Sequence, residues 1–211
     1  MMRSNFFNFT KMQVSALSQI VWLQLLCIVL YPLFFSQLNA SNDLANVIIY
    51  AAGLLMLSYL IMRNFAFNDA KHKTKLLFSI LPVTPKAIVG ARGTIVYLFC
   101  LIATPLLVLF SNIIHMVKPE MFAAVPVHIL PEGILLVAVF LPIEFLIFYI
   151  FETQKADIIA ALACFPYMGL MFLIHKYLLS NSLWIVVLVI AVFTNVICFT
   201  VCQKLYKNKQ I

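Results

Sequence analysis

The sequence predicts an all-α polytopic membrane protein with six transmembrane helices. Of its 211 residues, 64% are hydrophobic and 10% are charged, and the mean hydropathy is +1.07. Soluble domains contain roughly 45–50% apolar and about 25% charged residues. The apolar residues form unbroken runs close to the ~20 residues with which a helix crosses a bilayer core. Unbroken runs favour helices over a membrane β-barrel, whose strands alternate apolar and polar residues.

Six apolar runs are the predicted spans of a single membrane domain that covers residues 1–211. They are residues 16–35, 44–62, 94–110, 132–151, 158–174 and 183–201. Residues 1–15 mix aromatic and polar side chains, which predicts a short interfacial segment. A cleaved signal peptide is the competing interpretation, but the run that follows exceeds the roughly 7–15 residues of a signal's apolar region. A chain of this length leaves no room for a soluble catalytic domain.

Lysine and arginine are divided unequally between the two sides of this predicted bundle. Six spans place both termini on one side, which then carries all of the 14 Lys and Arg residues except Lys118 and Lys176. The positive-inside rule assigns such a side to the cytoplasm, so cytoplasmic termini are expected. The formal net charge of +7 follows from this topology, and membrane lipid rather than nucleic acid is the expected surrounding.

The main polar interval of the chain is residues 63–92, between the second and third spans. It contains four lysines and two arginines but a single acid, Asp69. At about 100° per residue, its middle forms a short amphipathic helix with polar residues on one face and leucine and isoleucine on the other. Pro82 and Pro85 are expected to end this helix, because proline lacks an N–H and clashes with the preceding turn. Such a helix lies flat on a membrane or docks on a soluble partner, and a solvated loop held by lipid headgroups is the alternative.

Motifs for nucleotide binding and hydrolytic chemistry are absent from the sequence. None of the five glycines opens a G-x-x-x-x-G-K-[ST] loop, so this ATP-binding motif is missing. The sequence contains no HExxH or GxSxG motif and no pair of acids suited to an intramembrane protease. The five cysteines lie in or beside apolar runs without the spacing of a metal site. No catalytic residue, resident cofactor or metal is therefore expected, and an intramembrane enzyme is the least favoured interpretation.

Glu144 is the one acid embedded in an apolar run. A carboxylate inside a membrane is energetically costly, which makes it a functional candidate. The alternative is that Glu144 lies near the cytoplasmic end of its span and reaches water past Pro142. Gln24, in the first span, is expected to face other helices.

Two stretches of the chain resemble the small ABC-2 type transporter permeases. Residues 69–83, DAKHKTKLLFSILPV, followed by Lys86 and Arg92, resemble the first cytoplasmic loop of that family. There a polar stretch leads to a Ser-Leu-Pro-like turn and then to a basic residue before the third span. Residues 141–156 resemble the end of the family's fourth span, where Leu-Pro and aromatic residues precede a Gly-x-x-Lys-like turn. The six-span plan matches over the whole chain. Three departures are the inserted Ile80 in the Ser-Leu-Pro turn, Pro85 where a basic residue is common, and the absence of the glycine in residues 152–154.

The resemblance implies the permease subunit of an ABC-type exporter. Such permeases pair as homodimers or heterodimers to form the translocation pathway in the cell membrane, and a separate ATP-binding subunit hydrolyses the ATP. The loop helix would be the coupling helix that rests on this ATPase subunit. The residues implied for the contact are Asp69, Lys71, Thr74, Lys75, Leu77, Phe78, Ser79 and Pro82. Glu144 or Gln24 would line the pathway, and the exported compound would be a peptide or another amphipathic compound.

A non-transporting membrane protein is the alternative to a permease. It would be an immunity or regulatory factor that binds a peptide or protein partner. A neighbouring reading frame for a stand-alone ATP-binding subunit would favour the permease. The sequence leaves open the substrate, the direction of transport and the choice between homodimer and heterodimer.

Overall fold

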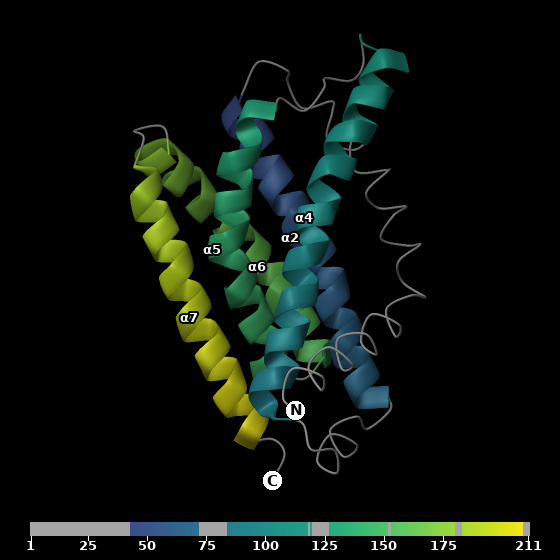
Figure 1. Cartoon of the computed structure of the whole chain (residues 1–211), viewed down its shortest axis with the longest axis vertical. Helices are drawn as coiled ribbons and strands as arrows, with labels where there is room; N and C mark the ends of the chain where they lie inside the picture. The colour runs from purple at the N-terminus through teal and green to yellow at the C-terminus, as the bar shows by residue number, and fades with distance from the viewer. Residues whose placement is uncertain are drawn as a thin grey trace.

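The computed structural model describes residues 43–71, 84–117, 119, 127–151, 153–179 and 183–208. Within these ranges the chain is helical and contains no β-strand, as predicted. Five helices in this part of the chain are long and apolar enough to cross a bilayer, and they lie side by side (Figure 1). The predicted first span at 16–35 and the part of the predicted amphipathic helix that follows Lys71 lie outside the described residues.

The long helices extend past their predicted spans at one end or both. They are α2 (Asp43–Lys71), α4 (Pro85–Val117), α5 (Leu130–Ile150), α6 (Thr153–Ile174) and α7 (Trp184–Asn208). A short 3-10 helix, η1 (Val127–Ile129), precedes α5, and a π-helical segment, η2 (His175–Leu179), continues α6. The differences are largest at the end of α2 and the start of α4. Residues 63–71 and 85–92 of the predicted polar interval are helical and belong to α2 and α4. Charged residues therefore do not end these helices.

Residues 72–84 connect α2 to α4 and are called the connector below. Pro85 is the first residue of α4, where proline is well tolerated because the N–H at that position has no intrahelical partner. Thr84 caps the helix: the backbone nitrogen of Ala87 lies 2.9 Å from the Thr84 carbonyl and 3.3 Å from its Oγ1. Helix α4 thus begins at Pro85, directly after the connector.

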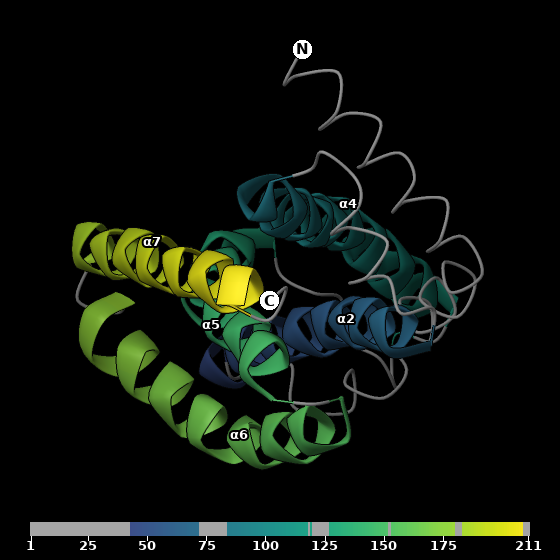
Figure 2. The same cartoon turned by 90° about the horizontal axis from the view of Figure 1, so that it is seen from below.

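Helix α5 is the central element of the described bundle. It packs against α2, α6 and α7, and the end-on view shows it between them (Figure 2). Its sequence has no polar face, as expected for a membrane helix that contacts other helices and lipid. Leu136, Phe140 and Leu141 on this helix are almost completely buried. Helix α4 contacts α2 and α7 instead.

Two glycines allow the helices to approach each other closely. A Cβ at Gly93 of α4 would lie 2.4 Å from Cε1 of Phe199 on α7. A Cβ at Gly133 of α5 would lie 2.2 Å from Cδ1 of Tyr50 on α2. Because lipid is as apolar as leucine, close packing and hydrogen bonds, more than the hydrophobic effect, hold helices together in a membrane. These contacts therefore contribute to the association of α4 with α7 and of α5 with α2.

An interhelical amide compensates for a proline inside α5. Pro142 has no N–H to donate to the carbonyl of Ala138, four residues earlier. Nδ2 of Asn195 on α7 donates to that carbonyl at 2.9 Å, and the Tyr97 hydroxyl on α4 donates to Oδ1 of the same Asn195. Within a bilayer core, backbone groups freed by proline need such protein partners because water is absent. One amide thus joins α4, α5 and α7.

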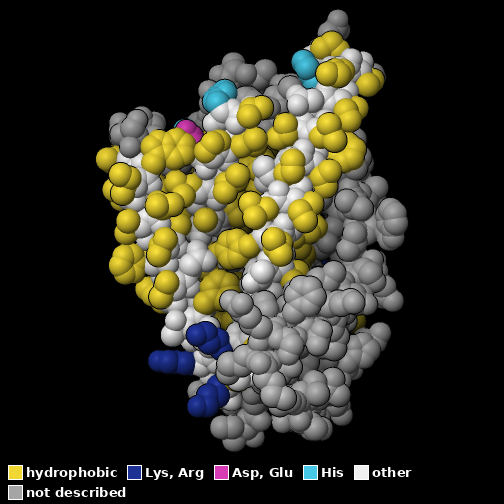
Figure 3. Space-filling model, in the orientation of Figure 1, with side chains coloured by type: hydrophobic (Ala, Val, Ile, Leu, Met, Phe, Trp, Pro, Cys, Tyr) yellow, Lys and Arg dark blue, Asp and Glu magenta, His cyan; other side chains and the backbone are white. Residues whose placement is uncertain are grey.

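Charged and polar side chains gather at the two ends of the described helices. The space-filling view shows Lys and Arg at one end, His at the other, and an apolar band between them (Figure 3). We call the first the basic end; it includes Arg63, Lys86, Lys155, Lys204 and Lys207. At the opposite end, Nε2 of His175 on η2 lies 2.6 Å from Oε2 of Glu132 on α5. This arrangement is the one expected of a bundle that crosses a bilayer.

Candidate functional site

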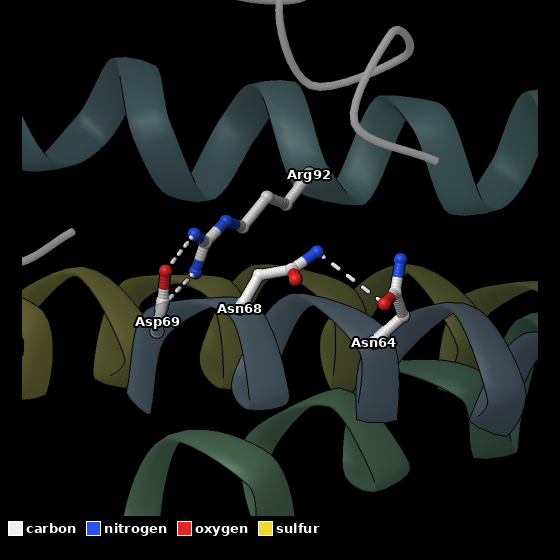
Figure 4. A network of polar contacts seen from close by, with 4 residues as sticks. All are labelled: Asn64, Asn68, Asp69 and Arg92. Carbon is white, nitrogen blue, oxygen red and sulfur yellow. Dashed lines mark hydrogen bonds and ion pairs between the residues drawn. The ribbon is translucent and has the colours of Figure 1, made fainter. Parts of the chain in front are cut away.

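A buried ion pair joins α2 and α4 at the base of the connector. Arg92 lies near the start of α4 and Asp69 near the end of α2, and the two side chains face each other (Figure 4). Nη1 and Nη2 of the guanidinium donate to Oδ2 and Oδ1 of the carboxylate, both at 2.7 Å. The side chains are only 5% and 11% exposed. A bidentate pair of this kind fixes orientation as well as distance.

Arg92 also lies against side chains from two further helices. Its guanidinium is 5.3 Å from the ring centroid of Phe65 on α2, a cation–π contact. It lies within electrostatic range of Tyr149 on α5 and Tyr206 on α7, whose rings are 6.1 Å apart in an edge-to-face arrangement. We call these five residues, Arg92, Asp69, Phe65, Tyr149 and Tyr206, the Arg92 cluster. It connects four of the five long helices.

Two buried donors beside this pair have no acceptor among the described residues. They are Nε of Arg92 and Nδ2 of Asn64, whose Oδ1 accepts a 3.3 Å hydrogen bond from Asn68 (Figure 4). Leaving a buried donor without an acceptor costs about 1–3 kcal/mol. Within the described residues the polar network is therefore incompletely satisfied.

The comparisons with known proteins identify the family of the chain. The family model described as ABC-2 family transporter protein matches residues 10–207. This chain belongs to that family. The match includes all five described helices as well as the predicted first span. A comparison with curated proteins found no match, and neither did a comparison with solved structures.

An ABC-2 transporter protein is a membrane component of transport and is not itself catalytic. In this one, no group of three or more His, Cys, Asp or Glu side chains in the described part of the chain could hold a metal ion. The described residues of the site are instead ion-paired, hydrogen-bonded or aromatic. Such an arrangement fixes the positions of the helices relative to one another.

The residues that the resemblance assigns to the ATPase contact are only partly described in this ABC-2 transporter protein. Asp69 belongs to α2 and its carboxylate binds Arg92. Lys71 is the last residue of α2. The remaining contact residues and the pathway candidate in the first span lie outside the described residues: Thr74, Lys75, Leu77, Phe78, Ser79, Pro82 and Gln24.

Glu144 is buried in the apolar part of α5 and is 6% exposed. Its Oε2 has no hydrogen-bond partner among the described residues. The carboxylate lies within electrostatic range of Tyr59 on α2 and Cys100 on α4, so it faces the region where α2, α4 and α5 meet. There Sγ of Cys100 lies 3.0 Å from Oγ of Ser58. The structure thus places this acid inside the chain, and Pro142 does not open it to water.

Sequence reasoning missed Arg92 and Asn195 as central residues of this ABC-2 transporter protein. Arg92 was grouped with the other basic residues of the polar interval, and Asn195 lies unremarked in an apolar run. A signal for Arg92 was present, because the interval contains a single acid with which an arginine could pair. For Asn195, the signal was a polar side chain in the last span together with a proline in the fourth.

Proposed function

We propose that this chain is the permease subunit of an ABC-type exporter in the cell membrane. The family match over residues 10–207 is the observation that carries the proposal. Because the sequence lacks the glycine- and lysine-containing phosphate loop, a separate ATP-binding subunit would bind and hydrolyse ATP. A second copy of the chain or a sister permease would complete the translocation pathway.

The proposed orientation has six spans with both termini and the connector in the cytoplasm. The basic end carries Arg63, Lys155 and Lys204, whereas the opposite end carries His128 and Glu132. Cytoplasmic segments of membrane proteins are enriched in lysine and arginine, which supports this orientation.

The connector would rest on the ATP-binding subunit as the coupling helix. Its sequence supports this role, since at about 100° per residue one side is apolar and the other polar before Pro82. The apolar side consists of Leu76, Leu77, Ile80 and Leu81, and the polar side of Asn68, Lys71, His72, Lys75 and Ser79. Asp69 would act at the base of this segment. The amphipathic helix then has a soluble partner of its own rather than a lipid surface.

Glu144 and Gln24 would line the pathway of the exported peptide or other amphipathic compound. A carboxylate that is buried without a hydrogen-bond partner for Oε2 among the described residues suits a cationic group of such a compound.

Purification of the tagged full-length chain from its native membrane tests the proposal. We expect an ATP-binding subunit in stoichiometric amount and vanadate-sensitive ATP hydrolysis. Recovery of the chain without any ATP-binding subunit, from membranes in which its neighbouring genes are expressed, would contradict it.

A double variant tests the coupling segment within that complex. Lys75→Ala with Phe78→Ala should lower the affinity for the ATP-binding subunit roughly tenfold, which corresponds to about 1.4 kcal/mol. Lys204→Ala is the matched control, because it removes an exposed lysine at the same end of the bundle. Unchanged association and ATP hydrolysis in the double variant would remove the coupling assignment.

A further inference from the structure

We propose that Arg92 is a positioning residue that transmits movement of the connector to α5 and α7. The inference rests on the proposed function, because it supposes a motor subunit that moves the connector. It goes beyond that function in naming the residue and the contacts through which the movement would reach the rest of the bundle.

The first step is that the Asp69–Arg92 pair makes the two ends of the connector a single mechanical unit. The pair has two parallel 2.7 Å hydrogen bonds between side chains that are almost fully buried. Water cannot readily compete for such a pair, and its planar geometry resists rotation as well as separation. A force on the connector would therefore displace α2 and α4 together instead of unwinding either end.

The second step is that α4 contacts α7 directly beside Arg92. The next residue, Gly93, has no side chain, so the ring of Phe199 approaches the backbone of α4. The ring of Phe199 lies 5.2 Å from that of Phe145 on α5, and the ring of Phe145 lies 5.0 Å from that of Tyr149. Tyr149 in turn lies within electrostatic range of Arg92. These contacts form a closed circuit through α4, α7 and α5.

The third step is that this circuit is close-packed and can therefore carry a displacement. Packed interiors respond to small shifts by moving between discrete arrangements rather than by deforming continuously. Nε of Arg92 has no acceptor among the described residues, so the guanidinium has a further donor to offer in a shifted arrangement.

A second ion pair at the same end provides a natural contrast. Nε of Arg63 on α2 lies 3.1 Å from Oδ2 of Asp157 on α6, and the Arg63 side chain is 55% exposed. An exposed pair of this kind is screened by solvent and contributes little. It joins α2 to α6 and does not reach α4 or α7. Arg63 is therefore the matched control for Arg92.

The experiment measures ATP-dependent movement in the purified complex without requiring the exported compound. Spin labels are placed at the exposed positions Lys86 on α4 and Lys207 on α7, in a background whose native cysteines are replaced by alanine. The distance distribution between the labels is recorded with and without ATP and vanadate. The compared chains are the parent, Arg92→Lys, Asp69→Asn and Arg63→Lys.

We expect the parent and Arg63→Lys to show an ATP–vanadate-dependent change in this distance. Arg92→Lys should retain the ATP-binding subunit and basal ATP hydrolysis, while the shifted population falls roughly fivefold or more, the lower end of typical coupling effects. Asp69→Asn changes a residue assigned to the ATPase contact, so the same fall is expected in those of its complexes that retain the ATP-binding subunit. A merely structural role would lower the amount of folded complex and leave the movement of the surviving complex intact. That result, or an unchanged shift in both variants, would overturn the inference.

Failure of the proposed function gives a different result. In that case the parent chain itself would purify without an ATP-binding subunit, before any variant is compared. If Arg92→Lys does not fold, Asp69→Asn decides the question in complexes that retain the ATP-binding subunit, because it keeps the shape of the side chain and one acceptor oxygen.

Discussion

Asn195 on α7 supplies the hydrogen bond that Pro142 on α5 cannot make. Proline lacks an N–H, so the carbonyl of Ala138 has no intrahelical donor, and Nδ2 of Asn195 lies 2.9 Å from it. The same amide donates to the carbonyl of Ala191 on its own helix at 2.7 Å. A proline inside the central helix is thus tolerated because a neighbouring helix completes its backbone hydrogen bonding.

This relationship predicts that the effect of Asn195→Leu depends on residue 142. In the parent chain the substitution should lower the free energy of unfolding by about 0.6–2 kcal/mol, the range of interhelical hydrogen bonds in membranes. In a Pro142→Ala background the loss should be smaller, because the N–H of residue 142 can bond to Ala138. Unfolding in detergent of the parent chain, the two single variants and the double variant gives the interaction energy between residues 142 and 195. Equal losses in the two backgrounds would contradict the compensation.

The glycine contacts predict opposite outcomes for the same substitution on different helices. Gly133→Ala should destabilise the chain by about 1–3 kcal/mol, because the new methyl group would overlap the ring of Tyr50. That ring is buried, and its hydroxyl is held by Oγ1 of Thr104 at 2.7 Å, so it has little freedom to move away. Gly169→Ala is the control, since nothing lies within 4 Å of its Cβ position.

The control should gain stability, because alanine is about 1 kcal/mol more favourable than glycine within a helix. Thermal unfolding of the detergent-solubilised chain measures both effects. Equal melting temperatures for Gly133→Ala and Gly169→Ala would show that the close contact between α5 and α2 is not required.

Glu144 is expected to lower the free energy of unfolding, as a buried acid that serves function rather than stability would. Replacing this buried acid by leucine should raise the free energy of unfolding by about 1–3 kcal/mol, because a poorly satisfied polar group is removed. The proposed pathway role predicts that Glu144→Leu abolishes export while the ATP-binding subunit remains bound. Glu132→Leu is the contrast, because its carboxylate is paired with His175 and its loss should be destabilising. Lower stability in Glu144→Leu would indicate that Glu144 has a structural partner.

The proposed orientation predicts which end of the bundle a membrane-impermeant thiol reagent can reach. In a background without native cysteines, Lys176→Cys should be labelled on intact cells, because it lies at the end opposite the basic end. Lys204→Cys should be labelled only after the membrane is opened. Both side chains are exposed in the structure, so accessibility depends on the side of the membrane. The reverse labelling pattern would place the connector outside the cell and remove its proposed contact with a motor.

Apolar runs were sufficient to predict the class of fold and the approximate positions of the described helices. Their ends were not predictable in the same way, since a hydropathy pattern treats charged residues as the start of a loop. Asp69 continues α2 and Arg92 belongs to α4 because each is buried with an opposite charge, whereas Arg63 continues α2 with its side chain largely in solvent. Neutralisation of this kind depends on which helices are neighbours, and that information is not contained in any local stretch of sequence.

The candidate site shows the same limit at the level of single residues. Asp69 was singled out, but its carboxylate binds Arg92, 23 residues further along the chain. Glu144 was identified correctly as an embedded acid because one charge in an apolar run is a local signal. Asn195 acts on a carbonyl 57 residues earlier, and its importance depends on a proline in another helix. Long-range polar partners of this kind need the packed bundle to be recognised.

Helix α7 follows α4 and α5 in the chain, and this order has a consequence for biogenesis. Helix α5 is translated before Asn195, so the Ala138 carbonyl has no side-chain donor from residue 195 until α7 has been made. The ring of Phe199, which fills the space above Gly93, arrives later still. Insertion of α7 therefore supplies contacts that α4 and α5 lack until then, and nascent chains that stop short of it would present unpaired helix surfaces to membrane quality-control proteases.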